Sequence, residues 1–266
     1  MQAWQAIVAV YFGYLALLSV FVPIRPGFRR WTPAAACLAL PALALPAAVQ
    51  GLAQVVVLAV LPAAFLIASY WLSGLFFTGP MPAVERGLLG ADRWLLPRLG
   101  LSWLAARGPR WLLEGLELSY LLVYLMVPAG AFVLAVAGHA GALPRYWAVV
   151  LAAALGSYAM MPWVQTRPPR ALEAGDPFQG RTLRFRTANL AVLSRGSHQA
   201  NTVPSGHAAA ALAAALGVAS ALPAAGAAFL VLAVAIAVAT VVGRYHYAID
   251  TILGIGMGVA AWIVFG

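Results

Sequence analysis

Lysine is absent from the sequence: all 16 positively charged residues are arginine, and only 7 residues are acidic. Schiff-base catalysis and Walker-type phosphate loops both depend on a lysine, so neither is available to this chain. Cysteine occurs once, at Cys37 within an apolar run, which excludes a disulfide framework and a thiolate metal site. No ligand spacing for a metal is present, and no cofactor is expected.

Charge of either sign is also scarce. Charged residues make up 9% of the chain and hydrophobic residues 64%, whereas soluble domains carry roughly a quarter charged residues. The mean hydropathy is +0.90. Apolar runs of about 20 residues, the length that crosses a bilayer, recur from end to end. The sequence therefore predicts an all-α, polytopic bundle of membrane helices, integral to the cell membrane, with no detachable soluble domain.

About eight transmembrane spans account for most of the chain. The first apolar run is too long for a signal-peptide core and no small-residue cleavage site follows it, so a retained helix is expected. In residues 79–112 arginine alternates with Leu and Trp, which indicates amphipathic helices in the membrane interface. We therefore divide the chain into amino-terminal helices with an interfacial segment (1–112) and a membrane core (113–266). The expected spans are 4–24, 33–50, 53–78, 113–137, 145–164, 205–221, 226–242 and 247–265.

The order of these spans places three polar clusters at one membrane face. Residues 205–221 and 226–242 form a hairpin, so its two open ends must emerge on the same face. The longest hydrophilic stretch, residues 165–203, leads directly into this hairpin and lies on that face as well. Ionisable groups in or beside apolar spans are energetically costly and by default indicate function.

The first cluster is Val203-Pro204-Ser205-Gly206-His207, at the start of the sixth expected span. Pro204 and Ser205 are typical of a helix start, with Ser205 as the N-cap. The free amides of the first turn can bind an anion, which Gly206 allows to approach closely, and His207 could donate a proton to a leaving oxygen. The alternative is that these residues only open a helix and that His207 caps an interface.

The second cluster runs from Gly243 to Asp250 and contains His246 and Asp250, four residues apart. This spacing predicts that both side chains lie on one face of a helix. The Asp250 carboxylate can then hydrogen bond one ring nitrogen of His246 and leave the other as a base or nucleophile. The alternative is a neutral His–Asp pair that joins two helices.

The third cluster, Gln165-Thr166-Arg167-Pro168-Pro169-Arg170, follows the fifth expected span. Its two prolines stiffen the backbone, so the flanking guanidinium groups lose little entropy on binding. The planar fork of arginine matches the oxygens of a phosphate. The alternative for either arginine is a cationic anchor at the membrane edge.

Pro204-Ser205-Gly206-His207 followed by His246-Tyr247-Ala248-Ile249-Asp250 resembles the signature of the type-2 phosphatidic acid phosphatase superfamily. The resemblance covers roughly residues 165–265. It implies a six-helix catalytic core and a two-step reaction through a phosphohistidine. In that scheme His246 is the nucleophile, Asp250 orients it, and His207 is the general acid.

The sequence departs from the usual motifs of that superfamily at two places. Met160 stands where the first motif usually has Lys, and Ala239-Thr240 stand where the third usually has Ser-Arg. This variant is more similar to the inositol phosphorylceramide synthase branch, whose members move a phosphoryl headgroup between lipids. Arg244 is expected to supply the missing charge. The residues expected to bind phosphate are Arg167, Arg170, Ser205, Gly206 and Arg244.

Three functions are consistent with these residues. The first is a lipid phosphate phosphatase acting on a phospholipid or an isoprenoid phosphate. The second is a lipid phosphotransferase, in which an alcohol replaces water as the acceptor. The third is a transporter or channel whose path is lined by His and Asp. The expected partners are a membrane lipid substrate and the bilayer, with no nucleic acid, and a homo-oligomer is compatible with the sequence.

The membrane side of the polar face is left open by the arginine distribution. With the spans above, fifteen of the 16 arginines fall on that face and only Arg145 lies opposite. The positive-inside rule therefore favours a cytoplasmic site. Most members of the superfamily that the sequence resembles act instead on the outer or lumenal face.

Overall fold

The computed structural model describes residues 1–266 and contains helices but no strand other than the isolated bridge between Thr166 and Asn201. It confirms the predicted all-α bundle. Two short 3-10 helices, Ala140–Ala142 and Pro169–Ala171, supplement the α-helices. The α-helices are α1 (Ala3–Phe21), α2 (Trp31–Ala42), α3 (Leu45–Ala48), α4 (Gly51–Gly74), α5 (Pro82–Arg98), α6 (Leu101–Arg107), α7 (Arg110–Val136), α8 (Leu143–Tyr158), α9 (Arg184–Gly196), α10 (Gly206–Ala219), α11 (Pro223–Val242) and α12 (Ala248–Phe265).

A helix occupies each of the expected spans, but not all are long enough to cross a bilayer unaided. Six helical segments are long and apolar enough to do so. They are α1, the combined segment of α2 and α3, and the helices α4, α7, α11 and α12. The second is divided near its end, where Pro41 and Pro46 remove backbone donors. Helices α8 and α10 have 16 and 14 residues, so α10 is only about 21 Å long against a hydrocarbon core of about 30 Å. The expected number of eight is therefore not confirmed for these two helices.

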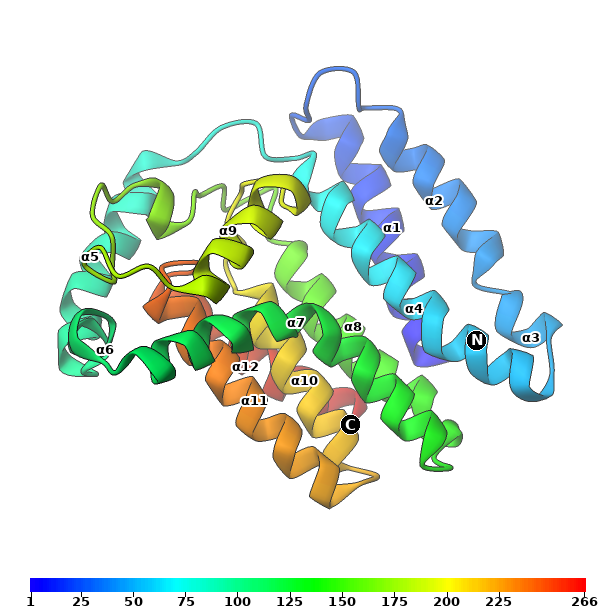
Figure 1. Ribbon diagram of the computed structural model, residues 1–266. Helices are drawn as coiled ribbons and strands as arrows, with labels where there is room; N and C mark the ends of the chain where they lie inside the picture. The colour runs from blue at the N-terminus through cyan, green and yellow to red at the C-terminus, as the bar shows by residue number, and fades with distance from the viewer.

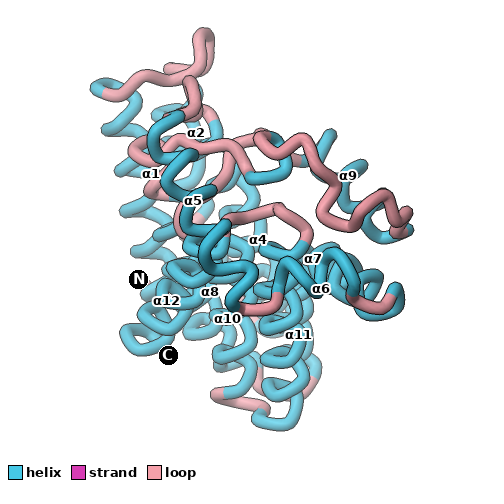
Figure 2. Tube along the Cα trace, turned by 90° about the vertical axis from the view of Figure 1, so that its left-hand side faces the viewer, coloured by secondary structure: helices cyan, strands magenta, loops and turns pink.

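Helix α8 lies at the centre of the bundle. It contacts α1, α4, α7, α10 and α12, and its residues from Tyr146 to Leu151 are all buried. The largest hydrophobic cluster gathers around it and extends to Trp4 and Phe12 on α1. In Figures 1 and 2 the bundle helices run roughly side by side, and the longer loops with α9 lie at one end. The buried α8 therefore gives that end a rigid base.

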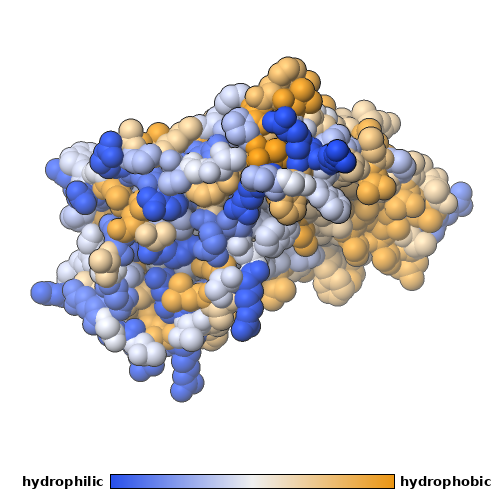
Figure 3. Space-filling model, turned by 90° about the horizontal axis from the view of Figure 1, so that it is seen from above, coloured by the Kyte–Doolittle hydropathy of each residue, from blue (hydrophilic) through white to orange (hydrophobic).

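The residues expected in the membrane interface form α5, α6 and the first turn of α7. Their helices carry several arginines together with exposed tryptophans, including Trp94, Trp103 and Trp111. Figure 3 shows hydrophilic residues gathered over α5, α6 and α9, whereas apolar residues dominate the region of α1–α4. This arrangement agrees with an amphipathic segment at the edge of a membrane. The division into 1–112 and 113–266 stays a prediction.

The three polar clusters do meet at this end of the bundle, as helix connectivity predicted. Asn201 donates its backbone N–H to the carbonyl of Thr166 at 2.7 Å. The N–H of Arg170 donates to the carbonyl of Arg244 at 3.1 Å. These bonds join the loop after α8, the segment before α10 and the turn between α11 and α12. Arg25, between α1 and α2, is also on this face, because it donates to the His198 carbonyl at 3.4 Å.

Glycines on α12 bring it close to α10. A Cβ added to Gly254 would lie 2.5 Å from the carbonyl oxygen of Ser205 and 3.2 Å from the Cβ of Ala208. Gly258, one turn later, faces the carbonyl of Ala209 at 3.0 Å in the same construction. Small residues at such a spacing allow two membrane helices to pack backbone against backbone. The position of the Ser205 turn therefore depends on a glycine of α12.

Gly254→Ala should lower the stability of the fold, because the added methyl group forces α12 away from Ser205. Overpacking of this kind costs about 1–3 kcal/mol. The matched control is Gly256→Ala on the same helix, where an added Cβ meets no atom within 4 Å. Thermal unfolding of the detergent-solubilised variants should give a lower melting temperature for the first only. Equal melting temperatures would show that the close packing of Gly254 against Ser205 does not contribute to the stability of the fold.

Candidate active site

Ser205 begins α10 in the way that the sequence predicts. Its side-chain oxygen accepts the N–H of Ala208 at 3.3 Å, which makes it the N-cap. The missing side chain of Gly206 leaves room for the ring of Tyr158, which an added Cβ would meet at 2.5 Å. His207 follows in the first turn of the helix. The helix start and the tight Gly206 position are thus both present.

His246 lies against His207. The Nε2 atom of His246 and the Nδ1 atom of His207 are 3.2 Å apart, so two residues separated by 39 positions form one pair. His246 belongs to the turn between α11 and α12 and is 4% exposed. The loop end of the bundle therefore carries two imidazoles in direct contact.

The expected placement of His246 and Asp250 on one helical face is wrong. Helix α12 begins at Ala248, and Tyr247 is its N-cap residue. Asp250 instead folds back toward the helix start and accepts the N–H of Tyr247 at 3.2 Å, a common use of an acidic residue in a first turn. The two side chains are still neighbours, because His246 Nδ1 lies 3.7 Å from Asp250 Oδ2. The Nδ1 atom has no other partner, so a small rotation of either side chain would form the hydrogen bond.

Asn201 was not identified from the sequence, yet it connects the second and third clusters. Its side-chain amide donates to Asp250 Oδ2 at 2.7 Å and to the Thr166 hydroxyl at 3.2 Å. The N–H of Ser205 donates to the backbone carbonyl of Asp250 at 2.9 Å. Asparagine is common in polar loops, so only its buried position identifies it.

Two of the arginines expected at the phosphate are occupied by carboxylates. Arg167 forms a fork with Glu85, with Nε and Nη2 at 3.0 and 2.8 Å from its oxygens. Arg244 donates to Asp92 at 2.6 Å and to Glu173 at 2.7 Å. The N–H groups of both guanidinium groups are therefore partly taken by carboxylates. The partners Glu85 and Asp92 belong to α5, which the sequence did not connect with this site.

Arg170 is the arginine of this group that pairs with no carboxylate. Its guanidinium carbon lies 5.6 Å from the centre of the Tyr245 ring, and Nη1 is 3.4 Å from the Tyr245 carbonyl. Burial lowers its pKa. Burial, together with the charge of Arg170, lowers the pKa of His246 to about 3. His246 is therefore neutral near pH 7, with a lone pair available on one ring nitrogen.

The rings of Tyr245 and Tyr120 form a stack that packs against His207. Tyr245 lies flat on Tyr120 with centroids 3.8 Å apart, and Tyr120 in turn stacks on His207 at 5.2 Å. The Tyr245 hydroxyl donates to Glu117 on α7 at 2.5 Å, and Asn189 on α9 donates to the same carboxylate at 2.8 Å. The sequence signal that could have indicated these contacts is Glu117 itself, an acidic residue within an apolar helix. It connects α7, α9 and the His246 turn.

The apolar helices indicate an integral membrane protein, and the buried histidine pair with the unpaired arginine is its candidate active site. The sequence profile of the PAP2 superfamily, the type-2 phosphatidic acid phosphatases, matches residues 86–264. The chain belongs to this superfamily, whose members are phosphatases or phosphotransferases. Searches of curated proteins and of solved structures gave no match. The similarity to the inositol phosphorylceramide synthase branch stays a prediction.

Replacing Arg170 by Gln should raise the pKa of His246 by roughly one unit. The positive charge of Arg170 opposes protonation of the ring, so its removal makes the protonated form more favourable. Burial remains in the variant, so the pKa should stay below 6.5. Nuclear magnetic resonance titration of labelled histidines, assigned with His246→Gln, measures this change. Arg184→Gln, an exposed arginine on α9, is the control; equal shifts in both variants would contradict the assignment to Arg170.

Proposed function

We propose that the protein is a membrane lipid phosphate phosphatase that forms a phosphohistidine at His246. The observation that carries this proposal is the 3.2 Å contact between His246 Nε2 and His207 Nδ1, with Asp250 beside the other nitrogen of His246. One ring is thereby oriented as a nucleophile and the other is within reach of the same phosphorus. Membership in the PAP2 superfamily and the apolar helices support a lipid substrate.

The first step forms a P–N bond and breaks a P–O bond. Phosphate enters between the two rings, which must part because 3.2 Å leaves no room for it. His246 Nε2 attacks phosphorus, the ester oxygen leaves, and His207 Nδ1 gives it a proton. Asp250 stabilises the positive charge that develops on the His246 ring. Arg170 and the His207 N–H in the first turn of α10 stabilise the negative charge on the phosphate oxygens.

The second step reverses these roles. His207, now neutral, takes a proton from a water molecule, and the water oxygen attacks phosphorus. The P–N bond breaks, free phosphate leaves, and both imidazoles return to their starting states. An anion between the rings favours the protonated form of His207, which prepares the pair for another first step.

Transfer to an alcohol is the second candidate function. It is favoured by the Arg167-Pro168-Pro169-Arg170 variant of the first motif and by Thr240 where an arginine is usual. A polar cavity of about 370 Å³ beside Arg170 supplies space for the hydroxylated part of an acceptor. In this case an alcohol oxygen replaces water in the second step.

His246→Ala should abolish turnover of lipid phosphates and the trapping of a phosphoenzyme, because His246 Nε2 supplies the nitrogen of the proposed P–N bond. The control is His139→Ala, an exposed histidine in the turn after α7. Acid quenching with a ³²P-labelled lipid phosphate should label the wild type and the control but not the first variant. Vanadate, which adopts the five-coordinate geometry of the transition state, should inhibit the wild type. Retained labelling of His246→Ala would exclude the proposed intermediate.

Hydrolysis and transfer differ in the fate of the phosphorus. The phosphatase should release inorganic phosphate from a purified lipid phosphate with no added acceptor. A phosphotransferase should release little until a lipid or polyol alcohol is supplied, and the label should then appear in that alcohol. Phosphate assay and thin-layer chromatography of one reaction measure both, and phosphate release that an added alcohol neither raises nor diverts would exclude transfer.

A further inference from the structure

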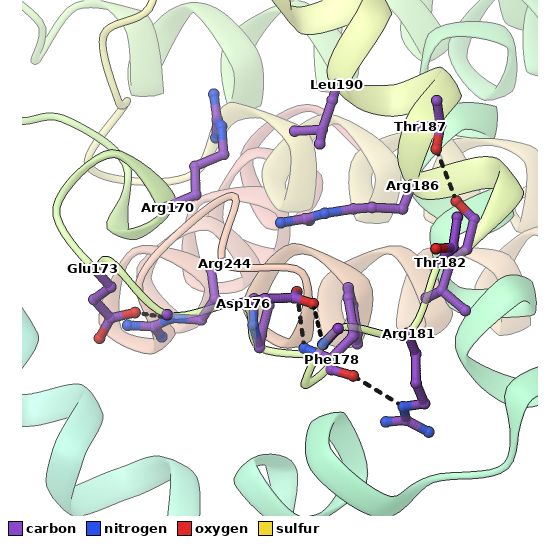
Figure 4. A pocket seen from close by; sticks show the side chains of 14 residues that line it. Arg170, Glu173, Asp176, Phe178, Arg181, Thr182, Arg186, Thr187, Leu190 and Arg244 are labelled. Atoms are coloured by element: carbon purple, nitrogen blue, oxygen red, sulfur yellow. Dashed lines mark hydrogen bonds and ion pairs between the residues drawn. The ribbon is translucent and has the colours of Figure 1, made fainter.

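A polar cavity of about 370 Å³ lies beside Arg170 and Arg244 and is only partly explained by the proposed reaction. It is bounded by α9, the loop 170–183 and the turn at Arg244 (Figure 4). Most of its lining is charged or polar, and only 3 of the 14 residues are hydrophobic. Four arginines face two acids, Glu173 and Asp176, so the lining has an excess of positive charge. A cavity of this kind suits a small anionic group rather than a lipid tail.

Two of the four arginines have structural partners. The guanidinium of Arg181 donates to the carbonyls of Phe178 at 3.0 Å and Gly108 at 2.7 Å, and also to that of Ala105. Arg244 is bound by Asp92 and Glu173. These two groups therefore hold loops and helices together, whereas Arg170 pairs with no carboxylate and Arg186 is bonded through Nη1 alone.

Arg186 is held in position with one edge free. Its Nη1 donates to the Gly243 carbonyl at 2.6 Å and contacts Glu117 at 3.4 Å. Its guanidinium carbon lies 4.9 Å from the Tyr245 ring centre and 5.3 Å from that of Phe178. No carboxylate or carbonyl accepts from Nε or Nη2, and Figure 4 shows the side chain extending into the cavity from α9. This edge is the fork that binds two oxygens of a phosphate.

The cavity acids do not compete for that edge. Asp176 accepts the N–H groups of Phe178 at 3.1 Å and Gly180 at 2.7 Å, and Glu173 is paired with Arg244. Both Arg170 and Arg186 lie over the same Tyr245 ring, at 5.6 and 4.9 Å from its centre. The charge of Arg170 also acts on His246, so Arg170 is the guanidinium that connects the cavity with the histidine pair.

We infer that Arg186 and Arg170 form a second phosphate-binding subsite next to the histidine pair. Its ligand is a phosphate group: either the second phosphate of a lipid diphosphate whose terminal phosphate lies at His246, or free inorganic phosphate. This inference rests on the proposed function only in taking the histidine pair as the reacting site. Arg186 is on this view a binding residue, and Arg170 contacts both phosphates.

The kinetic test compares a polyprenyl monophosphate with the matching diphosphate on the full-length protein in detergent. Arg186→Gln should lower the diphosphate-to-monophosphate ratio of kcat/KM by about tenfold, through a higher KM for the diphosphate. Arg184→Gln, two residues away on the exposed side of α9, should keep the wild-type ratio. Arg186→Lys, which keeps the charge but loses the fork, should give an intermediate ratio, and it provides the comparison if Arg186→Gln does not fold.

The second arm uses inorganic phosphate and needs no turnover. Isothermal titration should show two phosphate sites in the wild type and in Arg184→Gln, but one in Arg186→Gln. If Arg186→Gln loses one phosphate site but keeps the wild-type kinetic ratio, the subsite binds free phosphate only. If it loses one phosphate site and the kinetic ratio also falls, the subsite binds the second phosphate of the diphosphate substrate as well. An unchanged ratio with unchanged stoichiometry overturns the subsite. Failure of the proposed function would appear separately, as turnover that survives His246→Ala.

Discussion

The hydrogen bonds of Asp250 are the interaction on which the candidate site depends. Its carboxylate accepts from the Asn201 amide at 2.7 Å and from the Tyr247 N–H at 3.2 Å, and its carbonyl accepts from Ser205 at 2.9 Å. A buried carboxylate is costly unless it is hydrogen bonded. The segment before α10, the start of α10 and the turn before α12 must therefore be in place together. The same constraint brings His207 against His246.

Arginine pairing is the second constraint on this face. The chain has no lysine, and carboxylates from α5 and α7 neutralise arginines that come from distant loops. Arg244 illustrates the effect, because its backbone has a φ of 58°, in the left-handed region that side-chain-bearing residues avoid. Its ion pairs with Asp92 and Glu173 help to offset that conformational cost. The consequence is that Arg167 and Arg244, both expected to bind phosphate, are already paired with carboxylates, whereas Arg170 is not.

Much of the fold could be predicted because its signals are local. Apolar runs located the membrane helices, and Pro204-Ser205-Gly206 located the start of α10. The errors also have local causes. Asp250 accepts the N–H of Tyr247 at the start of α12, so His246 lies before the helix and does not share a helical face with Asp250. Prolines divide the second span.

The sequence by itself determined the class of protein and the residues of the candidate histidine pair. Hydropathy and helix order act over short stretches, and they were sufficient to bring His207, His246 and Asp250 to one face of the bundle. Only the tertiary structure decided which arginines are free, because Arg244 finds Asp92 across 152 positions and Arg167 finds Glu85 across 82. Asn201 and Glu117 acquire their roles in the same way. Pairing between distant segments depends on how the helices pack, which no local pattern in the chain records.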